Sequence, residues 1–157
     1  MGEAVDHLKV YHKVAEYKQK LQDGSRIVSL NWLPGRWIEL GEKLDCVPAL
    51  ATFDEGTVLL NASSRSHSWE FWVTHLGGEK QAQKYEVKMV SSHKDLPSNI
   101  TFQGKVYGSD TSKAEIYRDK GKWGDGVLEL SKGLMKKLGK MGQERFEVPM
   151  TYQLVRK

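Results

Sequence analysis

Residues 69–89 constrain the fold of this chain more than any other stretch. Apolar and polar side chains alternate over 69–74 and again over 85–89, and this period of two is typical of a half-buried β-strand. Gly77 and Gly78 between the two runs supply turn chemistry. We therefore expect two long strands that pair with each other at the centre of an antiparallel sheet. Their buried side would carry Trp69, Phe71, Val73, Tyr85, Val87 and Met89.

The size and composition of the chain are those of a globular domain. The 157 residues are 39% apolar and 28% charged, which is enough for one domain with its own core. No apolar run approaches the roughly 18 residues that a membrane span needs, and no signal-peptide pattern occurs. We expect a cytoplasmic protein, with the nucleus as a further location, and no membrane association.

Cysteine content and charge narrow the function classes. Cys46 is the single cysteine, so this chain alone forms neither an internal disulfide nor a multi-cysteine zinc site. Residues 79–157 hold 16 Lys and Arg against 10 Asp and Glu. Acidic residues are interleaved with this basic excess, which favours a solvated surface over a nucleic-acid site.

The N-terminal segment has a helical pattern. Residues 3–22 contain no Gly or Pro, and Val10, Val14, Tyr17 and Leu21 follow one helical stripe, so we expect a helix over at least the first half. An amphipathic helix of this kind docks on its own domain or pairs with another copy. The histidines at positions 7 and 12 have the H-x4-H spacing found in zinc fingers, although two histidines alone are weak evidence and favour surface residues.

Short strand-like runs separated by turn residues make up the rest of the chain. They cover residues 26–32, 36–40, 46–53, 57–62, 100–107, 114–117, 127–130 and 146–155. Pro149 predicts an edge position or a bulge in the last run. One helix is expected over 132–138, with Ser131 as its cap and Gly139 as its end. About eight strands with one late helix indicate an all-β fold, an antiparallel β-sandwich.

Several motifs occur in a distinctive order: LQDGSRIVSL, NWLPG, RWIEL, THLGGEKQAQKYEVKM and GVLELSKGLMKKLGKMGQERFEVPMTYQL. In this order the chain resembles the substrate-binding domain of the seven in absentia (Siah) ubiquitin ligases. Residues 76–89 and 127–138 carry the most specific part of the resemblance, and Leu33-Pro34-Gly35 adds a weaker match. The resemblance implies an eight-stranded antiparallel β-sandwich of the TRAF-like group over residues 19–157, preceded by a helical segment over 1–18.

The resemblance gives the N-terminal histidines a role. His7 and His12 would be ligands retained from the family's last zinc finger, whose cysteines lie upstream. Zinc is then expected in that upstream region, and no cofactor in the domain itself. The family's RING, which recruits the ubiquitin-conjugating enzyme, would also lie upstream. This chain has no Cys-x2-Cys pair, so ligase activity is not expected from it alone.

In the family, this domain binds extended degradation motifs of target proteins as an added strand, and it forms homodimers. The matching positions here are Gln19, Leu21, Trp37 and Glu147. Trp37 would be the anchor of the groove, since aromatic anchors often dominate such binding; a plain core tryptophan is the alternative. Arg36 and Glu39 place charge where the family's groove is more apolar.

Other classes of function have weaker support. His67, His75 and His93 are scattered, and no nucleophile or carboxylate pair accompanies them, so no catalytic site is expected. The five tryptophans could form a sugar-binding face, and Tyr107, Tyr117 and Trp123 could stack on single-stranded nucleic acid. The sequence therefore favours the partner-binding domain of a RING-type ubiquitin ligase, with a carbohydrate- or nucleic-acid-binding β-sandwich as the alternative.

Overall fold

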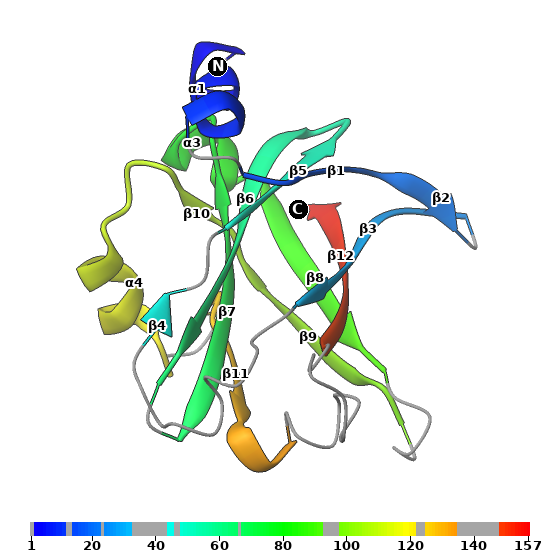
Figure 1. Ribbon diagram of the computed structural model, residues 1–157, viewed down its shortest axis with the longest axis vertical. Helices are drawn as coiled ribbons and strands as arrows, with labels where there is room; N and C mark the ends of the chain where they lie inside the picture. Colours follow the sequence, from blue (N-terminus) through cyan, green and yellow to red (C-terminus); the bar gives the residue numbers. More distant parts are fainter. Residues whose placement is uncertain are drawn as a thin grey trace.

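The computed structural model of the chain describes residues 2–11, 14–22, 24–32, 44–45, 48–65, 67–92, 98–121, 125–134 and 148–157. Within these ranges most residues form β-strands, which assemble into two sheets, and the helices are few and short (Figure 1). The predicted all-β class is confirmed at this level. No helix among these residues is long and apolar enough to cross a membrane.

The first sheet is built around β7, which lies at its centre. Its strands are β1 (Glu16–Lys18), β4 (Leu44–Asp45), β5 (Ala49–Phe53), β6 (Gly56–Ser64), β7 (Ser68–His75), β10 (Tyr107–Gly108) and β11 (Leu128–Ser131). Along one path the order is β1-β5-β6-β7-β10, with β4 paired to β6 and β11 paired to β7. The pairs β1–β5 and β10–β7 are parallel, so the sheet is not purely antiparallel as predicted.

The second sheet has the order β2-β3-β12-β8-β9, and its strands are antiparallel. They are β2 (Lys20–Gln22), β3 (Ser25–Trp32), β12 (Val148–Arg156), β8 (Tyr85–Ser91) and β9 (Ile100–Lys105). The chain crosses between the sheets at Gln19, because β1 ends at Lys18 in the first sheet and β2 begins at Lys20 in the second. The strands β1 and β2 therefore lie at the ends of their respective sheets.

Strands β7 and β8 do not pair with each other, so the predicted hairpin is wrong. They belong to different sheets, and the one-turn helix α3 (Glu79–Ala82) lies between them (Figure 1). Gly78 precedes the helix with a φ of 83°, a conformation that glycine adopts without strain. The Gly77-Gly78 segment thus leads through α3 from the first sheet to the second. Strand β7 pairs with β6 and β11, while β8 pairs with β12 and β9.

The expected burial of both strands is confirmed, because the inner faces of the two sheets share one core. Trp69, Phe71, Val73, Val87 and Met89 are at most 1% exposed, and Tyr85 packs against the same core at its margin. The first sheet adds Leu60 and Ala62, and the second adds Val28, Met150 and Tyr152. Burial of this apolar surface is the dominant favourable term in folding.

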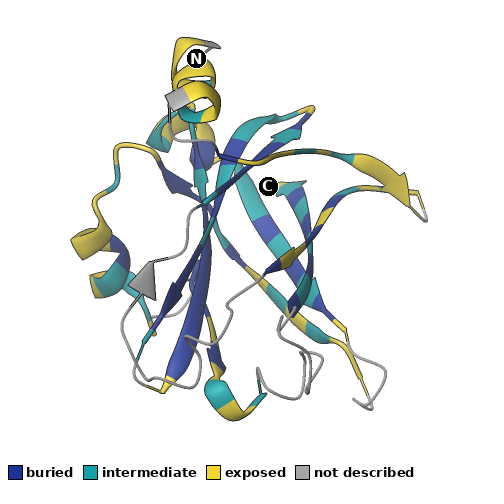
Figure 2. Cartoon of the chain, viewed as in Figure 1, coloured by how far each residue is buried: buried dark blue, intermediate teal, exposed yellow. Residues whose placement is uncertain are grey.

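Strand β7 is buried on its outer face as well, as its dark blue ribbon shows in Figure 2. The helix α4 (Lys113–Asp119) covers this face, and Trp72, Tyr107, Ile116 and Val127 form a second apolar cluster. The strand predicted over 114–117 is therefore wrong. Ser112 accepts a hydrogen bond from the Glu115 N–H and begins a helix there, and Ile116 gains burial against the sheet.

The N-terminal prediction holds for the first half only. The helix α1 (Gly2–Tyr11) ends before the expected stripe does, and the chain is extended from Glu16. Val10 on this helix is 68% exposed, whereas Val14 beyond it is buried. The predicted stripe ends early because Tyr17 lies in β1, which pairs with β5, and Leu21 lies in β2, which pairs with β3.

Two predictions near the C-terminus have different outcomes. Pro149 is not at a sheet edge, because β12 lies between β3 and β8. It is accommodated because the pairing of β12 with β8 begins only at Thr151, and Ser91 Oγ donates to the Pro149 carbonyl over 2.7 Å. Ser131 Oγ accepts from the Leu134 N–H as the predicted cap, and 132–134 are helical. The strand predicted over 36–40 lies outside the described residues.

Candidate functional site

Three of the predicted site residues, His12, Trp37 and Glu147, lie outside the described residues. His7 is exposed on α1. Gln19 and Leu21 lie where the chain passes from β1 to β2. Among the described residues, no three His, Cys, Asp or Glu side chains come together in a group that could hold a metal ion.

Leu21 lies on a sheet edge. Within the described part of the chain β2 pairs with β3 only, and the Leu21 side chain is 73% exposed. Large apolar side chains exposed to this degree are uncommon in this protein, and Val10 is the other described example. The site thus joins an open strand edge to an exposed aliphatic side chain.

The register of the β2–β3 hairpin decides which backbone groups reach the open edge. Gln22 is paired with Ser25 across a two-residue turn, and the pair that flanks such a turn is hydrogen-bonded. Hydrogen-bonded and non-hydrogen-bonded pairs alternate along an antiparallel ladder. Leu21, paired with Arg26, is therefore in a non-hydrogen-bonded pair. Its N–H and C=O point away from β3, towards the open edge.

Asp54 in the turn between β5 and β6 holds this hairpin to the other sheet. Its Oδ1 accepts from Gln19 Nε2 at 2.6 Å, and its backbone N–H donates to Gln19 Oε1 at 3.2 Å. The same carboxylate forms an ion pair with Arg26, which lies opposite Leu21. The Gln19 amide is thus occupied within the protein, so this residue positions β2 through its side chain. We call Gln19, Arg26 and Asp54 the Asp54 clamp.

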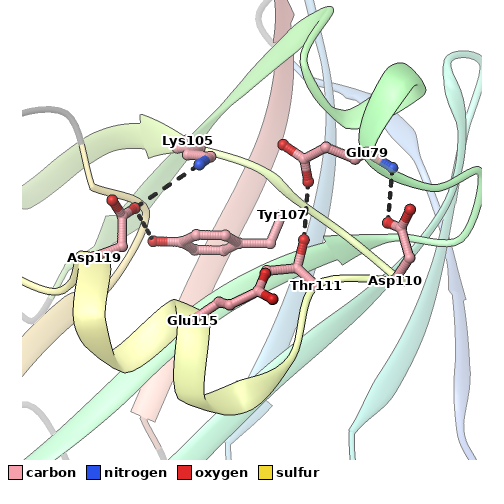
Figure 3. A pocket seen from close by; sticks show the side chains of 7 residues that line it. All are labelled: Glu79, Lys105, Tyr107, Asp110, Thr111, Glu115 and Asp119. Atoms are coloured by element: carbon pink, nitrogen blue, oxygen red, sulfur yellow. Dashed lines mark hydrogen bonds and ion pairs between the residues drawn. The ribbon is translucent and has the colours of Figure 1, made fainter.

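A second feature, a polar cleft of about 270 Å³, lies between α3, β10 and α4 (Figure 3). Its lining residues are Glu79, Lys105, Tyr107, Asp110, Thr111, Glu115 and Asp119.

Two of the cleft carboxylates cap each other's segments. Asp110 Oδ1 accepts from the Glu79 N–H at 3.0 Å, which satisfies a free donor at the start of α3. Glu79 Oε2 in turn accepts from the Gly108 N–H at 3.0 Å and from Thr111 Oγ1 at 2.9 Å. These carboxylates therefore join α3 to the turn after β10.

Tyr107 forms the inner wall of the cleft. Its hydroxyl donates to Asp119 Oδ2 at 2.9 Å and accepts from the Gly126 N–H at 2.9 Å. Burial raises the pKa of Tyr107 well above that of an exposed tyrosine, and the neighbouring Asp119 adds to the shift. The phenol therefore stays neutral. Lys105 Nζ lies 4.0 Å from Asp119 Oδ2 and 5.2 Å from the centre of the Tyr107 ring.

Three of the four carboxylates that line the cleft hold elements of the fold together. Among its lining residues Glu79, Asp110 and Asp119 are engaged in structural hydrogen bonds. Its geometry indicates a joint between α3, β10 and α4.

The aromatic side chains named for other binding modes are covered where the structure describes them. Trp32, Trp69 and Trp72 are at most 7% exposed, so they form no open face for a sugar ring. Tyr107 is 1% exposed, and the Arg65 guanidinium lies 4.4 Å from the centre of the Tyr117 ring. Trp123 is outside the described residues.

Sequence reasoning missed the Asp54 clamp and the Glu79–Asp110 caps. Residues 54–56 and 110–112 lie between the strands expected at 46–53 and 57–62 and at 100–107 and 114–117, and the sequence assigns them no role. The Ser112-x-x-Glu115 pattern marks the start of α4 but points to neither feature. Partners 29 to 35 residues apart leave no local pattern.

No protein-family model matches the sequence, and no curated protein matches it.

Proposed function

We propose that this chain is the non-catalytic, partner-binding part of a RING-type ubiquitin ligase. It recruits extended segments of target proteins for ubiquitination by accepting them as an added strand at the open edge of β2. The observation that carries the proposal is Leu21, where an exposed aliphatic side chain lies between outward-facing backbone groups. The two sheets with one core support the finer assignment to an eight-stranded TRAF-like sandwich of the Siah type.

In strand addition, backbone groups supply the affinity for a peptide and side chains supply the selectivity among peptides. The Leu21 N–H and C=O would each hydrogen-bond to the backbone of the incoming segment. These hydrogen bonds do not depend on the sequence of the segment. The Leu21 side chain would contact alternate side chains of the segment and select apolar ones. The Asp54 clamp holds β2 in place, so less ordering is needed on binding.

The remaining parts of the proposal rest on the family resemblance. Trp37 and Glu147 would complete the groove. His7 and His12 would be zinc ligands of a finger whose other half lies upstream, beside a RING that recruits the ubiquitin-conjugating enzyme. The protein would act as a homodimer in the cytoplasm or the nucleus.

The test is peptide selection followed by calorimetry. A phage-displayed library of random linear peptides is selected on the purified chain, and the best peptide is titrated into parent and variants. Leu21→Asp should weaken binding by about 2 kcal/mol, roughly 30-fold, as loss of a central anchor does. Val10→Asp is the matched control, because Val10 is similarly exposed but lies on α1, and it should bind like the parent.

Two outcomes would count against the proposal. Equal binding by the Leu21→Asp variant and the parent would remove the β2 edge as the site. The ligase assignment has its own check, in which the full-length protein and a ubiquitin-conjugating enzyme act on a fusion that carries the selected peptide. Peptide binding without ubiquitin transfer would retain the binding module and reject the ligase.

A further inference from the structure

The open edge of β2 lies on the same side of the chain as β5. Gln19 donates its backbone N–H to the Thr52 carbonyl of β5 at 3.1 Å. Backbone groups two residues apart in an extended chain point to the same side, so the outward N–H and C=O of Leu21 point to that side as well. Strand β5 itself ends at Phe53, before it reaches Leu21. A segment that pairs with Leu21 therefore occupies the space beyond the end of β5.

The β5–β6 turn bounds this space at one end. Asp54 in the turn accepts a hydrogen bond from the Gln19 side chain and donates its N–H to the same side chain, so the turn is held beside the start of β2. The backbone groups of Lys20 and Gln22 face β3. Within the described part of β2, Leu21 is thus the residue with backbone groups open on this side. The site accepts a short stretch of added strand.

A single open residue favours an antiparallel partner. In an antiparallel ladder, two residues that form a hydrogen-bonded pair exchange both bonds with each other, whereas a residue in a parallel ladder bonds to two different residues of its partner. One antiparallel residue opposite Leu21 therefore satisfies both its N–H and its C=O. The next residue along the segment then lies opposite Lys20, and the preceding one lies opposite Gln22.

The two faces of β2 differ in the groups that they offer. Leu21 lies on the same face as Arg26, whose guanidinium is already paired with the Asp54 carboxylate. The aliphatic side chain of Leu21 is therefore the group left to select a partner on this face. Lys20 lies on the other face, beside Ile27. It is exposed, and no carboxylate pairs with it among the described contacts.

The pairing geometry brings the free ammonium of Lys20 close to the segment. When Leu21 is in a hydrogen-bonded pair with the segment, Lys20 is in a non-hydrogen-bonded pair, in which the Cα atoms are about 4.5 Å apart rather than about 5.5 Å. Opposite charges in directly facing positions stabilise a pair of strands. The Asp54 carboxylate contacts Arg26 on the other face, so it does not face an acid placed opposite Lys20.

We infer that Lys20 is a specificity-determining residue of the β2 edge, which selects an antiparallel segment with an aliphatic residue opposite Leu21 followed directly by Asp or Glu opposite Lys20. The inference rests on the proposed function and assigns the chemistry of the partner segment and its direction. A parallel segment would need the reverse order, with the acid before the aliphatic residue. The order of the two residues therefore reports the direction of the added strand.

The peptides selected from the phage-displayed library test the order. Those recovered on the parent chain should share an aliphatic residue followed directly by an acidic one. In the best peptide, exchanging the two neighbours of the aliphatic residue should weaken binding about threefold, as calorimetry measures. Selection repeated on the Lys20→Glu variant should recover Lys or Arg at the position of the acid.

A charge exchange isolates the role of Lys20. Lys20→Glu replaces an attraction by a repulsion and should weaken binding of the selected peptide about fivefold. A peptide with Lys in place of its acid should regain most of this loss on the Lys20→Glu variant and bind the parent more weakly. Lys80→Glu is the matched control, because Lys80 is also exposed but lies on α3, away from β2 (Figure 1), and it should bind like the parent.

The outcomes separate this inference from the proposed function. Peptides that depend on Leu21 but contain no acid, or that bind Lys20→Glu like the parent, would keep the β2 edge as the site and overturn the role of Lys20. An acid that consistently precedes the aliphatic residue would overturn the antiparallel direction. Recovery of no peptide, or equal binding by Leu21→Asp and the parent, would overturn the proposed function and this inference with it.

Discussion

At the scale of single residues, two buried tyrosines have hydroxyls that are hydrogen-bonded within the fold. Tyr107 joins Asp119 to the Gly126 N–H, and the Tyr152 hydroxyl accepts from Trp32 Nε1 at 2.8 Å. Burial raises the pKa of both phenols far above that of an exposed tyrosine. The folded protein therefore requires both groups in their neutral form.

This requirement predicts a loss of stability in alkali. An unfolded tyrosine loses its proton near pH 10, while the folded Tyr107 and Tyr152 resist it, so their contribution is complete below that pH and is lost as pH rises further. Urea midpoints measured from pH 8 to 11.5 should fall above pH 10, and two of the six tyrosines should ionise only on unfolding, as tyrosinate absorbance reports. A constant midpoint across this range would contradict the assignment.

Substitution of Tyr107 tests the same hydroxyl at neutral pH. Tyr107→Phe leaves the Gly126 N–H and one Asp119 oxygen without this partner, and it should cost about 1–3 kcal/mol of unfolding free energy. Tyr85→Phe is the control, because Tyr85 is half-buried and its hydroxyl has no hydrogen bond among the described contacts, and it should cost little. Urea unfolding at pH 7 compares the two.

At the scale of elements, short helices are held by partners distant in sequence. A single turn such as α3 is not stable alone. Here Asp110 accepts a hydrogen bond from the Glu79 N–H at its start, and the Glu79 side chain accepts one from the Gly108 N–H at the end of β10. The helix α4 is fixed by Ile116 against Trp72 and by Lys120, whose Nζ lies 2.8 Å from Glu70 Oε1 and 3.0 Å from Glu129 Oε2. Desolvation opposes the charge on Lys120, but these carboxylates raise its pKa overall.

The mutual caps of α3 can be tested with a double-mutant cycle. Glu79→Ala and Asp110→Ala should each cost about 0.5–2 kcal/mol, the usual range for loss of a cap. The double variant should cost less than their sum, since both remove one joint. Glu115→Ala, in the same cleft, is the control and should be near neutral. Strictly additive costs would show that the two carboxylates act separately.

At the scale of the whole molecule, β7 separates two apolar layers. Its inner face contributes Phe71 to the core shared by both sheets, and its outer face contributes Trp72 to the cluster under α4. Phe71 contacts Trp32 of the second sheet, with ring centroids 6.1 Å apart. Stability therefore depends on the strand that joins both layers.

Truncation on the inner face should be severe. Phe71→Ala removes a fully buried ring and should cost about 3–5 kcal/mol, a large part of the 5–15 kcal/mol typical of a domain. Phe102→Ala on the edge strand β9 is the control, because its ring is only partly buried, and it should cost clearly less. Denaturant midpoints report both, and equal costs would contradict the shared core.

Part of the candidate site followed from sequence and part did not. Leu21 follows from the family resemblance, whereas the helical stripe predicted through the same residue gives no sign of the hairpin whose register turns its backbone outward. Asp54 has no such signal, since its partner Gln19 is 35 residues away. The region 114–117 was misjudged because its aromatic and branched residues favour strands, whereas the Ser112 cap favours a helix.

The sequence by itself determined that residues 69–74 and 85–89 are extended, and which of their side chains face the shared core. Alternation along 69–74 and 85–89 was sufficient, because a strand turns successive side chains to opposite faces. Only the tertiary structure decided that these strands belong to different sheets, with β6 and β11 beside one and β12 and β9 beside the other. Alternation specifies a face but not a partner. Partners are chosen by how all apolar faces are buried together, which is a property of the whole chain.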